Sequence, residues 1–367
     1  MSDGEQLRSV LYDIQARQGG RFEDFDGSIW TMDLGDPHGE YEAIRTSAGM
    51  WDVYALVKWT IDGPDAAGAI QRVFTNDVGS IVDGQVRYGG FTDADGCLLD
   101  EGTVYRRGAD SYFVFTNSDS FGEHIRMHSP DADVSVTNRT VDMPLISVQG
   151  PQSRELLQSV TDFDLSTLRY FRFATEKVMV AGVPVWLSRT GFSGELGFEL
   201  IPERNDAERL WLALAEAGVR PIGFSAVEIA RIEAGLIVYG YDYEPGQRSP
   251  FDVGLDGVVA FDRGVEFLGR EHVAAAASTP RNRFKTLRIN SDVAPEYGCD
   301  VTLGGEVVGT LTSPTISPRL GTIGLAVLHS EVASNGTMLN VPVGEASVSA
   351  VVDELALYDP TKRRPRG

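Results

Sequence analysis

Three acidic side chains stand at unusual places in this sequence and could do chemistry. Glu195 lies in the middle of the glycine-rich stretch RTGFSGELGFEL (189–200), where glycines let the backbone turn sharply or approach a ligand closely. Either Glu195 is part of a solvated hairpin tip, or it binds a ligand. Asp100 and Glu101 lie inside the otherwise apolar run LLDEGTVY (98–105). Carboxylates can hold a ligand by hydrogen bonds or handle a proton.

The run 98–105 alternates like a strand, so Asp100 and Glu101 are predicted to point to opposite faces. One carboxylate then faces the core, which is costly unless it is paired, hydrogen-bonded or lines a cavity. The alternative is an edge strand with both faces in water. Arg231 and Glu233 also stand among apolar residues, in ARIEAGL, and they could form an ordinary salt bridge within a helix.

Other chemical motifs are absent or incomplete. HIRMH places His124 and His128 on one helical face, but it lacks the glutamate of HExxH and a third ligand, so we predict no metal site. TDADG fails the register of a calcium loop and is predicted to be a hairpin turn. Glu195 stands where a GxSxG nucleophile elbow needs glycine. Neither a Walker A motif nor a GxGxxG that opens a helix is found.

Composition indicates a globular protein of 367 residues with two or three domains. The net charge of −21 argues against binding to nucleic acids or anionic membranes, and the only basic cluster is TKRRPRG (361–367). Cys97 and Cys299 make neither a disulfide framework nor a metal motif. We expect a cytoplasmic protein, because no apolar run of about 18 residues and no signal peptide is recognised.

Two strand-to-helix junctions look alike, one at Gly63-Pro64 and one at Gly150-Pro151. In both, the proline is predicted at the first helical position. Each junction is followed by several strand-like runs and a second helix, and a further helical pattern begins at Ser225. These repeated units predict a mixed α+β architecture built on two related halves. After a boundary near 278–284, short β-runs predict a small all-β barrel or sandwich over 282–367.

Five segments, in order along the chain, resemble motifs of the aminomethyltransferase family, which contains the glycine cleavage T-protein and folate-dependent demethylases. RTGFSGELGFEL is similar to R-T-G-[YF]-[ST]-G-E-x-G-[FVY]-E, and ARIEAGLIVYG (230–240) is similar to R-x-E-A-G-L-x-x-Y-G. The other three segments are GMWDVYALVKWTIDGPDA (49–66), FLGREHV (267–273) and LTSPTISPRLGTIGLAVL (311–328). Together the matches cover almost the whole chain.

The resemblance implies a three-lobed cloverleaf around a central cavity for tetrahydrofolate. Two related α/β lobes would comprise residues 1–52 with 140–245, and 53–139 with 246–280. The third lobe, 281–367, would be a C-terminal all-β barrel.

The resemblance also assigns residues to the folate site. Glu195 would hydrogen-bond the pterin ring, whose adjacent N–H and NH₂ groups suit a carboxylate. Arg231 would suit the glutamate carboxylate of folate. The remaining cofactor-binding positions implied by the family are Tyr88, Asn117 and Tyr358.

At the reacting centre the sequence departs from the family pattern. T-proteins carry Asp-Asp where this chain has Asp100-Glu101, and the second position is the one tied to catalysis. Glu101, with Asp100, would therefore orient the folate nitrogen or handle a proton. The family's Asp-Val-Ser-His is changed as well, to a sequence with Tyr54-Ala55.

These features predict an enzyme that moves a methyl or aminomethyl group from a small N-, S- or O-linked donor to folate N5. We favour a demethylase-type reaction because of Glu101 and Tyr54-Ala55. One alternative is a glycine-cleavage aminomethyltransferase that acts on a lipoyl carrier. A second is a folate-binding protein without transferase activity, although its K-G-C-Y-x-G-Q motif is missing. A third is a methyltransferase that does not use folate. A lipoyl carrier or a flavoprotein subunit is a possible partner.

Overall fold

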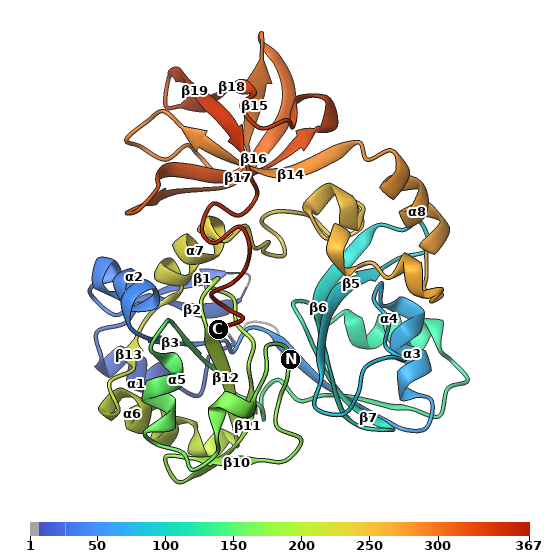
Figure 1. The fold of residues 1–367 in the computed structure, drawn as a ribbon, viewed down its shortest axis with the longest axis vertical. Helices are drawn as coiled ribbons and strands as arrows, with labels where there is room; N and C mark the ends of the chain where they lie inside the picture. The colour runs from blue at the N-terminus through green and yellow to red at the C-terminus, as the bar shows by residue number, and fades with distance from the viewer. Residues whose placement is uncertain (1–6, 26) are drawn as a thin grey trace.

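The computed structural model describes residues 7–25 and 27–367, which form three lobes (Figure 1). The first lobe was predicted to begin at residue 1, but residues 1–6 lie outside the described part of the chain. The predicted lobe boundaries stay a prediction. Among the described residues, no helix is long and apolar enough to span a membrane.

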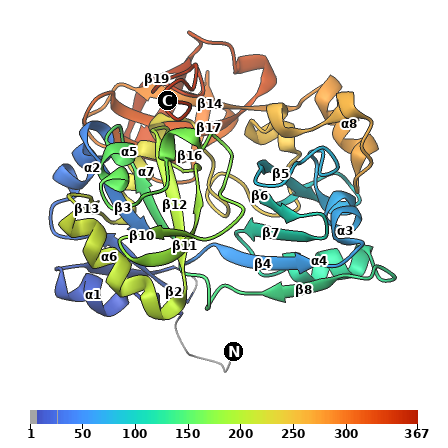
Figure 2. The same ribbon diagram turned by 60° about the horizontal axis from the view of Figure 1, so that its bottom comes forward.

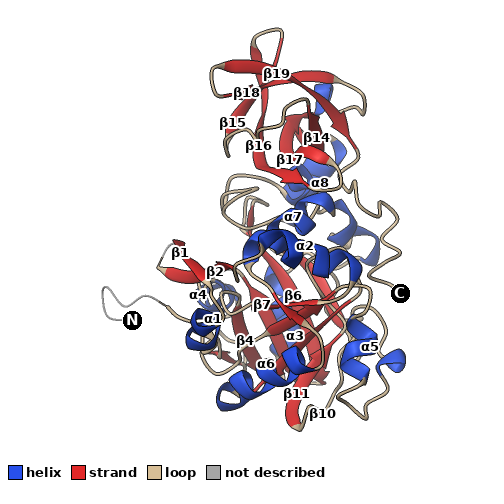
Figure 3. Ribbon diagram, turned by 90° about the vertical axis from the view of Figure 1, so that its left-hand side faces the viewer, coloured by secondary structure: helices blue, strands red, loops and turns tan. Residues whose placement is uncertain are grey.

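The first lobe is built on a six-stranded sheet with Trp211 and Phe198 in its core. A strand hairpin and helices surround this sheet (Figures 1 and 3). In sheet order the strands are β10 (Val178–Val180), β11 (Val183–Ser188), β12 (Gly197–Pro202), β9 (Ile146–Gln149), β3 (Gly49–Asp52) and β13 (Arg220–Pro221). The hairpin is β1 (Arg21–Phe25) and β2 (Ser28–Asp33), and the helices are α1 (Tyr12–Arg17), α2 (Pro37–Thr46), α5 (Ser153–Gln158), η1 (Leu165–Thr167), η2 (Arg204–Asp206), α6 (Ala207–Glu216) and α7 (Phe224–Glu233).

The second lobe is built on a five-stranded sheet, which lies beside the first sheet (Figure 2). Its core includes Trp59 and Phe91. In sheet order the strands are β5 (Val86–Thr92), β6 (Leu98–Gly108), β7 (Ser111–Thr116), β4 (Val57–Asp62) and β8 (Ser135–Asn138). The helices of this lobe and of the segment that leads to the barrel are α3 (Ala66–Val73), α4 (Phe121–His128), η3 (Pro250–Val253), η4 (Asp256–Val258), η5 (Phe261–Arg263) and α8 (Arg270–Ser278).

The two sheets share one topology, as the sequence predicts. The order β5-β6-β7-β4 in one sheet repeats as β10-β11-β12-β9 in the other. At the matching junctions Gly63 and Gly150 have φ of +142° and +139°, and a Cβ atom would lie 2.3 Å and 2.4 Å from backbone oxygens. Only glycine fits both constraints. Pro64 and Pro151 were predicted to occupy the first position of a helix, and this prediction is wrong. Each lies in the turn that precedes its helix, α3 or α5.

The third lobe is a closed six-stranded barrel, as predicted. Strand β14 pairs with both β17 and β19, which closes the sheet on itself. Helices α2 and α7 lie between the barrel and the sheet of the first lobe (Figures 1 and 3). After β19 the chain returns to the centre of the molecule and ends there (Figure 1). Around the barrel the elements are β14 (Asn282–Ile289), β17 (Gly321–His329), β16 (Glu306–Ser317), β15 (Cys299–Leu303), β18 (Met338–Val343) and β19 (Ala346–Asp353), with η6 (Ser330–Val332) after β17.

Candidate functional site

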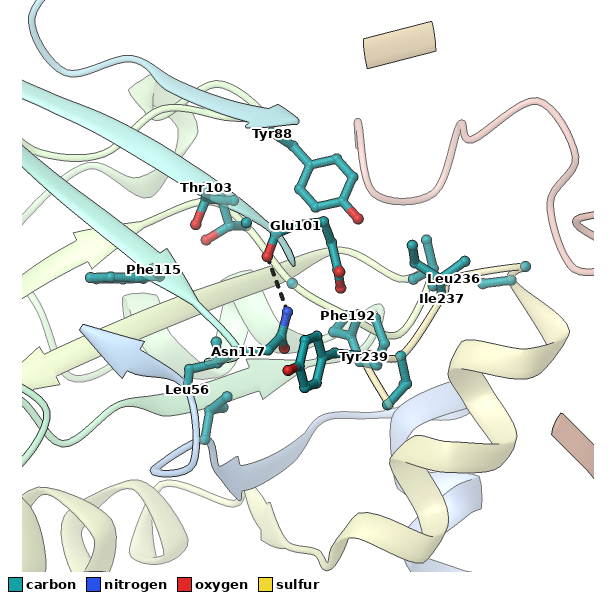
Figure 4. A pocket seen from close by; sticks show the side chains of 18 of the residues that line it. Leu56, Tyr88, Glu101, Thr103, Phe115, Asn117, Phe192, Leu236, Ile237 and Tyr239 are labelled. Atoms are coloured by element: carbon teal, nitrogen blue, oxygen red, sulfur yellow. Dashed lines mark hydrogen bonds between the residues drawn. The ribbon is translucent and has the colours of Figure 1, made fainter. Parts of the chain in front are cut away.

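A cavity of about 1020 Å³ lies at the centre of the molecule. Its wall is formed by strands of both sheets, by the segment after α7 and by the C-terminal tail. Most of its lining is apolar or aromatic, which suits a planar organic ligand. Figure 4 shows side chains of the second lobe opposite those of the segment after α7. Five of the seven predicted site residues line this cavity: Tyr88, Glu101, Asn117, Glu195 and Tyr358.

Glu195 is a buried carboxylate in the wall of the cavity, 3% exposed. Its Oε1 atom accepts hydrogen bonds from the Tyr358 hydroxyl and, at 3.2 Å, from Arg45 Nη1. Its Oε2 atom lies 3.5 Å from Arg364 Nη1. The guanidinium carbons of Arg45 and Arg364 lie 3.9 Å and 4.8 Å from the centre of the Tyr358 ring. These contacts join the first lobe to the C-terminal tail, and they exclude a solvated hairpin tip.

Arg45 is the residue of this cluster that sequence reasoning missed. Its guanidinium is buried and bonds Glu233 through Nε at 2.9 Å and Nη2 at 2.6 Å. It also donates to the carbonyl oxygens of Ser193 (2.9 Å) and Ala230 (3.0 Å). Glu233 further accepts from Tyr41 at 2.6 Å and from Ser317 of the barrel. These contacts connect α2, α7 and the barrel. Glu233 therefore does not form the ordinary salt bridge within one helix that the sequence allowed as an alternative. Arg45 sits in an unremarkable helical pattern, so no local signal could have found it.

Asp100 and Glu101 point to different surroundings, and both are buried. Asp100 Oδ1 accepts from Asn117 Nδ2 at 2.8 Å, and its Oδ2 accepts from the backbone N–H of Asn117 at 3.1 Å and of Ser118 at 2.8 Å. Burial raises the pKa of Asp100 to about 6. Asn117 Nδ2 also donates to the carbonyl of Glu101 at 3.0 Å (Figure 4). Asp100 thus holds the end of β7 against β6.

Glu101 projects into the cavity from β6 (Figure 4). Its carboxylate is 6% exposed and accepts a hydrogen bond from the hydroxyl of Tyr243, which is also buried. Burial, together with the neighbouring charge of Asp100, raises the pKa of Glu101 well above its ordinary value. The Tyr88 ring lies beside it, and burial raises the pKa of that phenol too. A buried carboxylate with a raised pKa at a cavity wall is equipped to exchange a proton.

Arg231 occupies a different position from the predicted one. It does not line the cavity, and its side chain is fully buried. Its guanidinium donates to Asp242 at 2.7 Å, to Ser313 of the barrel at 2.7 Å, and to Glu228 and the Leu236 carbonyl. Burial lowers the pKa of Arg231, but the negative charges of Glu228 and Asp242 raise it by more. The pKa therefore lies above its ordinary value. With its donors used in this way, Arg231 joins α7 to the barrel instead of facing a ligand.

Comparisons with known proteins agree with this architecture. The family model of the GCVT N-terminal domain matches residues 11–263, and that of the glycine cleavage T-protein C-terminal barrel domain matches residues 282–359. A probable aminomethyltransferase of Natronomonas pharaonis is 35% identical, over 95% of this chain and 98% of that protein. An aminomethyltransferase of Shouchella clausii is 33% identical, over 97% of this chain and 99% of that protein.

The fold alone is matched by a crystal structure, that of the glycine cleavage system aminomethyltransferase T from Bartonella henselae. It has a TM-score of 0.89 at 19% identity, over 97% of this chain and 99% of that chain. Fold and relatives together define a folate-dependent transferase. The chain belongs to the aminomethyltransferase family of glycine cleavage T-proteins.

Proposed function

We propose that this protein transfers the one-carbon unit of an aminomethyl group from a sulfur atom of a carrier-bound lipoyl arm to tetrahydrofolate held in the central cavity, with the carbon–sulfur bond broken to leave a thiol and the amine released as ammonia. The observation that carries the proposal is that Glu195 and Glu101, which come from different lobes, line the same cavity. Relatives over nearly the whole chain are named aminomethyltransferases, which supports this donor.

The cavity has the size and chemistry that a folate requires. Its volume of about 1020 Å³ is at the upper end of ordinary ligand pockets. Trp51, Phe192 and Phe224 supply aromatic surface for flat rings. Glu195 would accept hydrogen bonds from the adjacent N–H and NH₂ groups of a pterin, and Arg45 and Tyr358 fix its carboxylate for this role.

Glu101 would orient the reacting nitrogen and hold or take up its proton. Tetrahydrofolate, when bound, supplies the nitrogen that receives the one-carbon unit. Tyr243 fixes the Glu101 carboxylate, and the bonds between Asp100 and Asn117 fix the strand that carries it. Since the protein contributes no nucleophile in this proposal, positioning and electrostatics provide most of the rate.

The sequence favoured a demethylase-type reaction because two positions depart from the family motifs, Glu101 and Tyr54-Ala55. Neither departure requires a different donor. Tyr54 does not line the cavity, and its hydroxyl donates to the carbonyls of Ile29 (2.5 Å) and Leu7 (3.3 Å). Ala55 does line the cavity, but its methyl group makes no polar contact that would select one donor over another. Glu101 keeps a carboxylate in the cavity wall, where it accepts a hydrogen bond from the Tyr243 hydroxyl. We therefore propose the aminomethyl donor in place of a methyl donor.

The donor is tested by comparing two substrates with tetrahydrofolate present. We expect ammonia release from an aminomethylated lipoyl carrier protein. We expect no methyl transfer from small N-methyl or S-methyl compounds. Turnover of a methyl compound without turnover of the aminomethyl carrier would overturn the proposal and restore the demethylase-type reading.

Glu195→Gln is expected to weaken tetrahydrofolate binding by roughly 10- to 150-fold, because hydrogen bonds to a charged group contribute about 1.5–3 kcal/mol. Trp30 and Trp51 line the cavity, so quenching of tryptophan fluorescence reports the titration. Glu216→Ala, on the exposed surface of α6, is the control and should bind like wild type. Equal affinity of Glu195→Gln and wild type would remove Glu195 from the proposed site.

Tyr243→Phe is expected to shift the acid limb of the pH–rate profile to higher pH. The Tyr243 hydroxyl donates to the Glu101 carboxylate and so favours its ionised form. Its loss should raise the pKa of Glu101 further, and turnover should fall more at pH 6 than at pH 8. Tyr12→Phe, on α1 outside the cavity lining, serves as the control. A uniform loss at all pH values would mean that Tyr243 has only a structural role.

A further inference from the structure

A glutamine amide lies directly behind the glycine-rich part of the cavity wall. Gln149, the last residue of β9, is 1% exposed and does not itself line the cavity. Gly191 and Gly197, which stand on either side of Glu195 in the sequence, do line the cavity, and both approach this amide closely. A polar side chain buried in such a place requires hydrogen-bond partners, so its contacts show what it does.

The two glycines make room for the amide. A Cβ atom on Gly191 would lie 2.1 Å from Gln149 Oε1, and a Cβ atom on Gly197 would lie 2.1 Å from Gln149 Nε2. Neither glycine has a positive φ, so conformational freedom does not explain them. A glycine inside a strand pattern often marks the close approach of another group. Here that group is the Gln149 amide, which lies between the two glycines.

The amide bonds the glycine-rich turn at two points. Gln149 Nε2 donates to the carbonyl oxygen of Thr190 at 3.2 Å and to the hydroxyl of Ser147 at 3.0 Å. Its Oε1 atom accepts a hydrogen bond from the Ser193 hydroxyl at 2.8 Å. The reverse orientation would place the amide oxygen against the Thr190 carbonyl, and two acceptors cannot bond each other. Gln149 therefore connects both sides of the turn in one defined arrangement.

Ser193 connects Gln149 to Glu195. The Ser193 hydroxyl that donates to Gln149 also accepts the backbone N–H of Glu195 at 3.2 Å. The Ser193 carbonyl accepts from Arg45 Nη1 at 2.9 Å, and the same nitrogen bonds Glu195 Oε1 at 3.2 Å. Ser193 is 1% exposed, so water does not replace these bonds. The backbone of Glu195 is thus held by Gln149 through Ser193, and its carboxylate is held by Arg45.

We propose that Gln149 is a positioning residue for the pterin contact: its amide fixes the path of the turn and so directs the Glu195 carboxylate toward the ligand. The inference rests on the proposed function, because it assumes that Glu195 binds the pterin of tetrahydrofolate. Gln149 touches no ligand itself and acts through Ser193. A carboxylate that accepts two adjacent donors must be well aligned with both, so a displaced turn lowers the affinity for the ligand.

The test measures tetrahydrofolate binding by Gln149→Met with tryptophan fluorescence. Methionine has a similar length but no amide, so binding should weaken about 5- to 20-fold, the effect of losing one or two hydrogen bonds. The kcat at saturating tetrahydrofolate should stay within about threefold of wild type, because Glu101 lies on β6 of the other lobe. In a Glu195→Ala background the same substitution should weaken binding by less than about twofold, because the group that Gln149 positions is gone. Gln152→Met is the matched control: Gln152 bonds only Ser47, at 3.0 Å on the exposed surface, and the variant should bind like wild type.

The outcomes separate this inference from the proposed function. Wild-type affinity in Gln149→Met would overturn the inference, although tetrahydrofolate binding itself would stand. The inference would also be overturned by a fall in kcat as large as the fall in affinity, or by losses from Gln149→Met and Glu195→Ala that simply multiply, since both results indicate a general structural role. If the thermal midpoint shows that Gln149→Met is unfolded, Ser193→Ala decides: its affinity should fall about three- to tenfold through the lost hydroxyl, and unchanged affinity would reject the inference. Wild type that does not bind tetrahydrofolate would remove the proposed function and this inference together.

Discussion

Glu101→Gln is expected to lower turnover by about 10²- to 10⁴-fold, the usual contribution of a positioned acid–base group. Glutamine has nearly the shape of glutamate and can still accept the Tyr243 hydrogen bond, but it cannot take up a proton. Tetrahydrofolate affinity should change by about threefold at most, because Glu195 and the aromatic lining remain. Ammonia release from the aminomethyl carrier measures turnover, and fluorescence titration measures binding.

Glu101→Asp is the matched control for this prediction. It restores the carboxylate found in the family motif, but it draws that group back by about one methylene from Tyr243. Its turnover should lie between those of Glu101→Gln and wild type. Turnover of Glu101→Gln close to that of wild type would exclude Glu101 from proton handling, and equal losses in both variants would show that the position serves packing.

Arg45→Met is expected to lower the free energy of unfolding by about 3–5 kcal/mol, the cost of breaking a buried ion pair by removing one partner. Methionine fills part of the volume but leaves Glu233 buried without its cation, while Glu195 keeps only the more distant Arg364. Urea titration followed by circular dichroism measures the loss. Folate binding should weaken as well, because Arg45 helps to orient the Glu195 carboxylate.

Arg319→Met is the control for Arg45→Met. Arg319 pairs with Glu42 of the same helix, α2, at 2.9 Å, but both side chains are partly exposed. Exposed pairs contribute about 0–1 kcal/mol, so this variant should be only slightly destabilised. Similar losses in the two variants would contradict the view that burial makes the Arg45 cluster important to the fold.

Much of the fold was predictable from local patterns. Alternating apolar residues marked β6, helical spacing from Ser225 marked α7, and short β-runs marked the barrel. The glycines at 63 and 150 revealed two related halves, because a strand-to-helix turn of this shape excludes any Cβ. The positions predicted for the prolines beside them were wrong. A proline just before a helix and a proline at its first position look the same in the sequence.

The candidate site was predictable only in part. A carboxylate inside an apolar strand pointed to Glu101, a carboxylate in a glycine-rich turn pointed to Glu195, and family motifs added Tyr88, Asn117 and Tyr358; all of these line one cavity. The same motifs pointed to Arg231, which faces the barrel instead. A sequence motif shows that an arginine occurs at a position, but it does not show whether its side chain points to a ligand or to a neighbouring lobe.

Residue types and spacing were therefore enough to predict the family, the three lobes and two carboxylates that line the central cavity. Arg45 and Tyr243 emerged only once the lobes were packed together. Their partners are 188 and 142 residues away along the chain, and no local pattern encodes contacts at such separations. Hydrophobic periodicity is a property of neighbouring residues, whereas the polar clusters here form at the junctions between lobes, where the packing of whole sheets sets which charges meet.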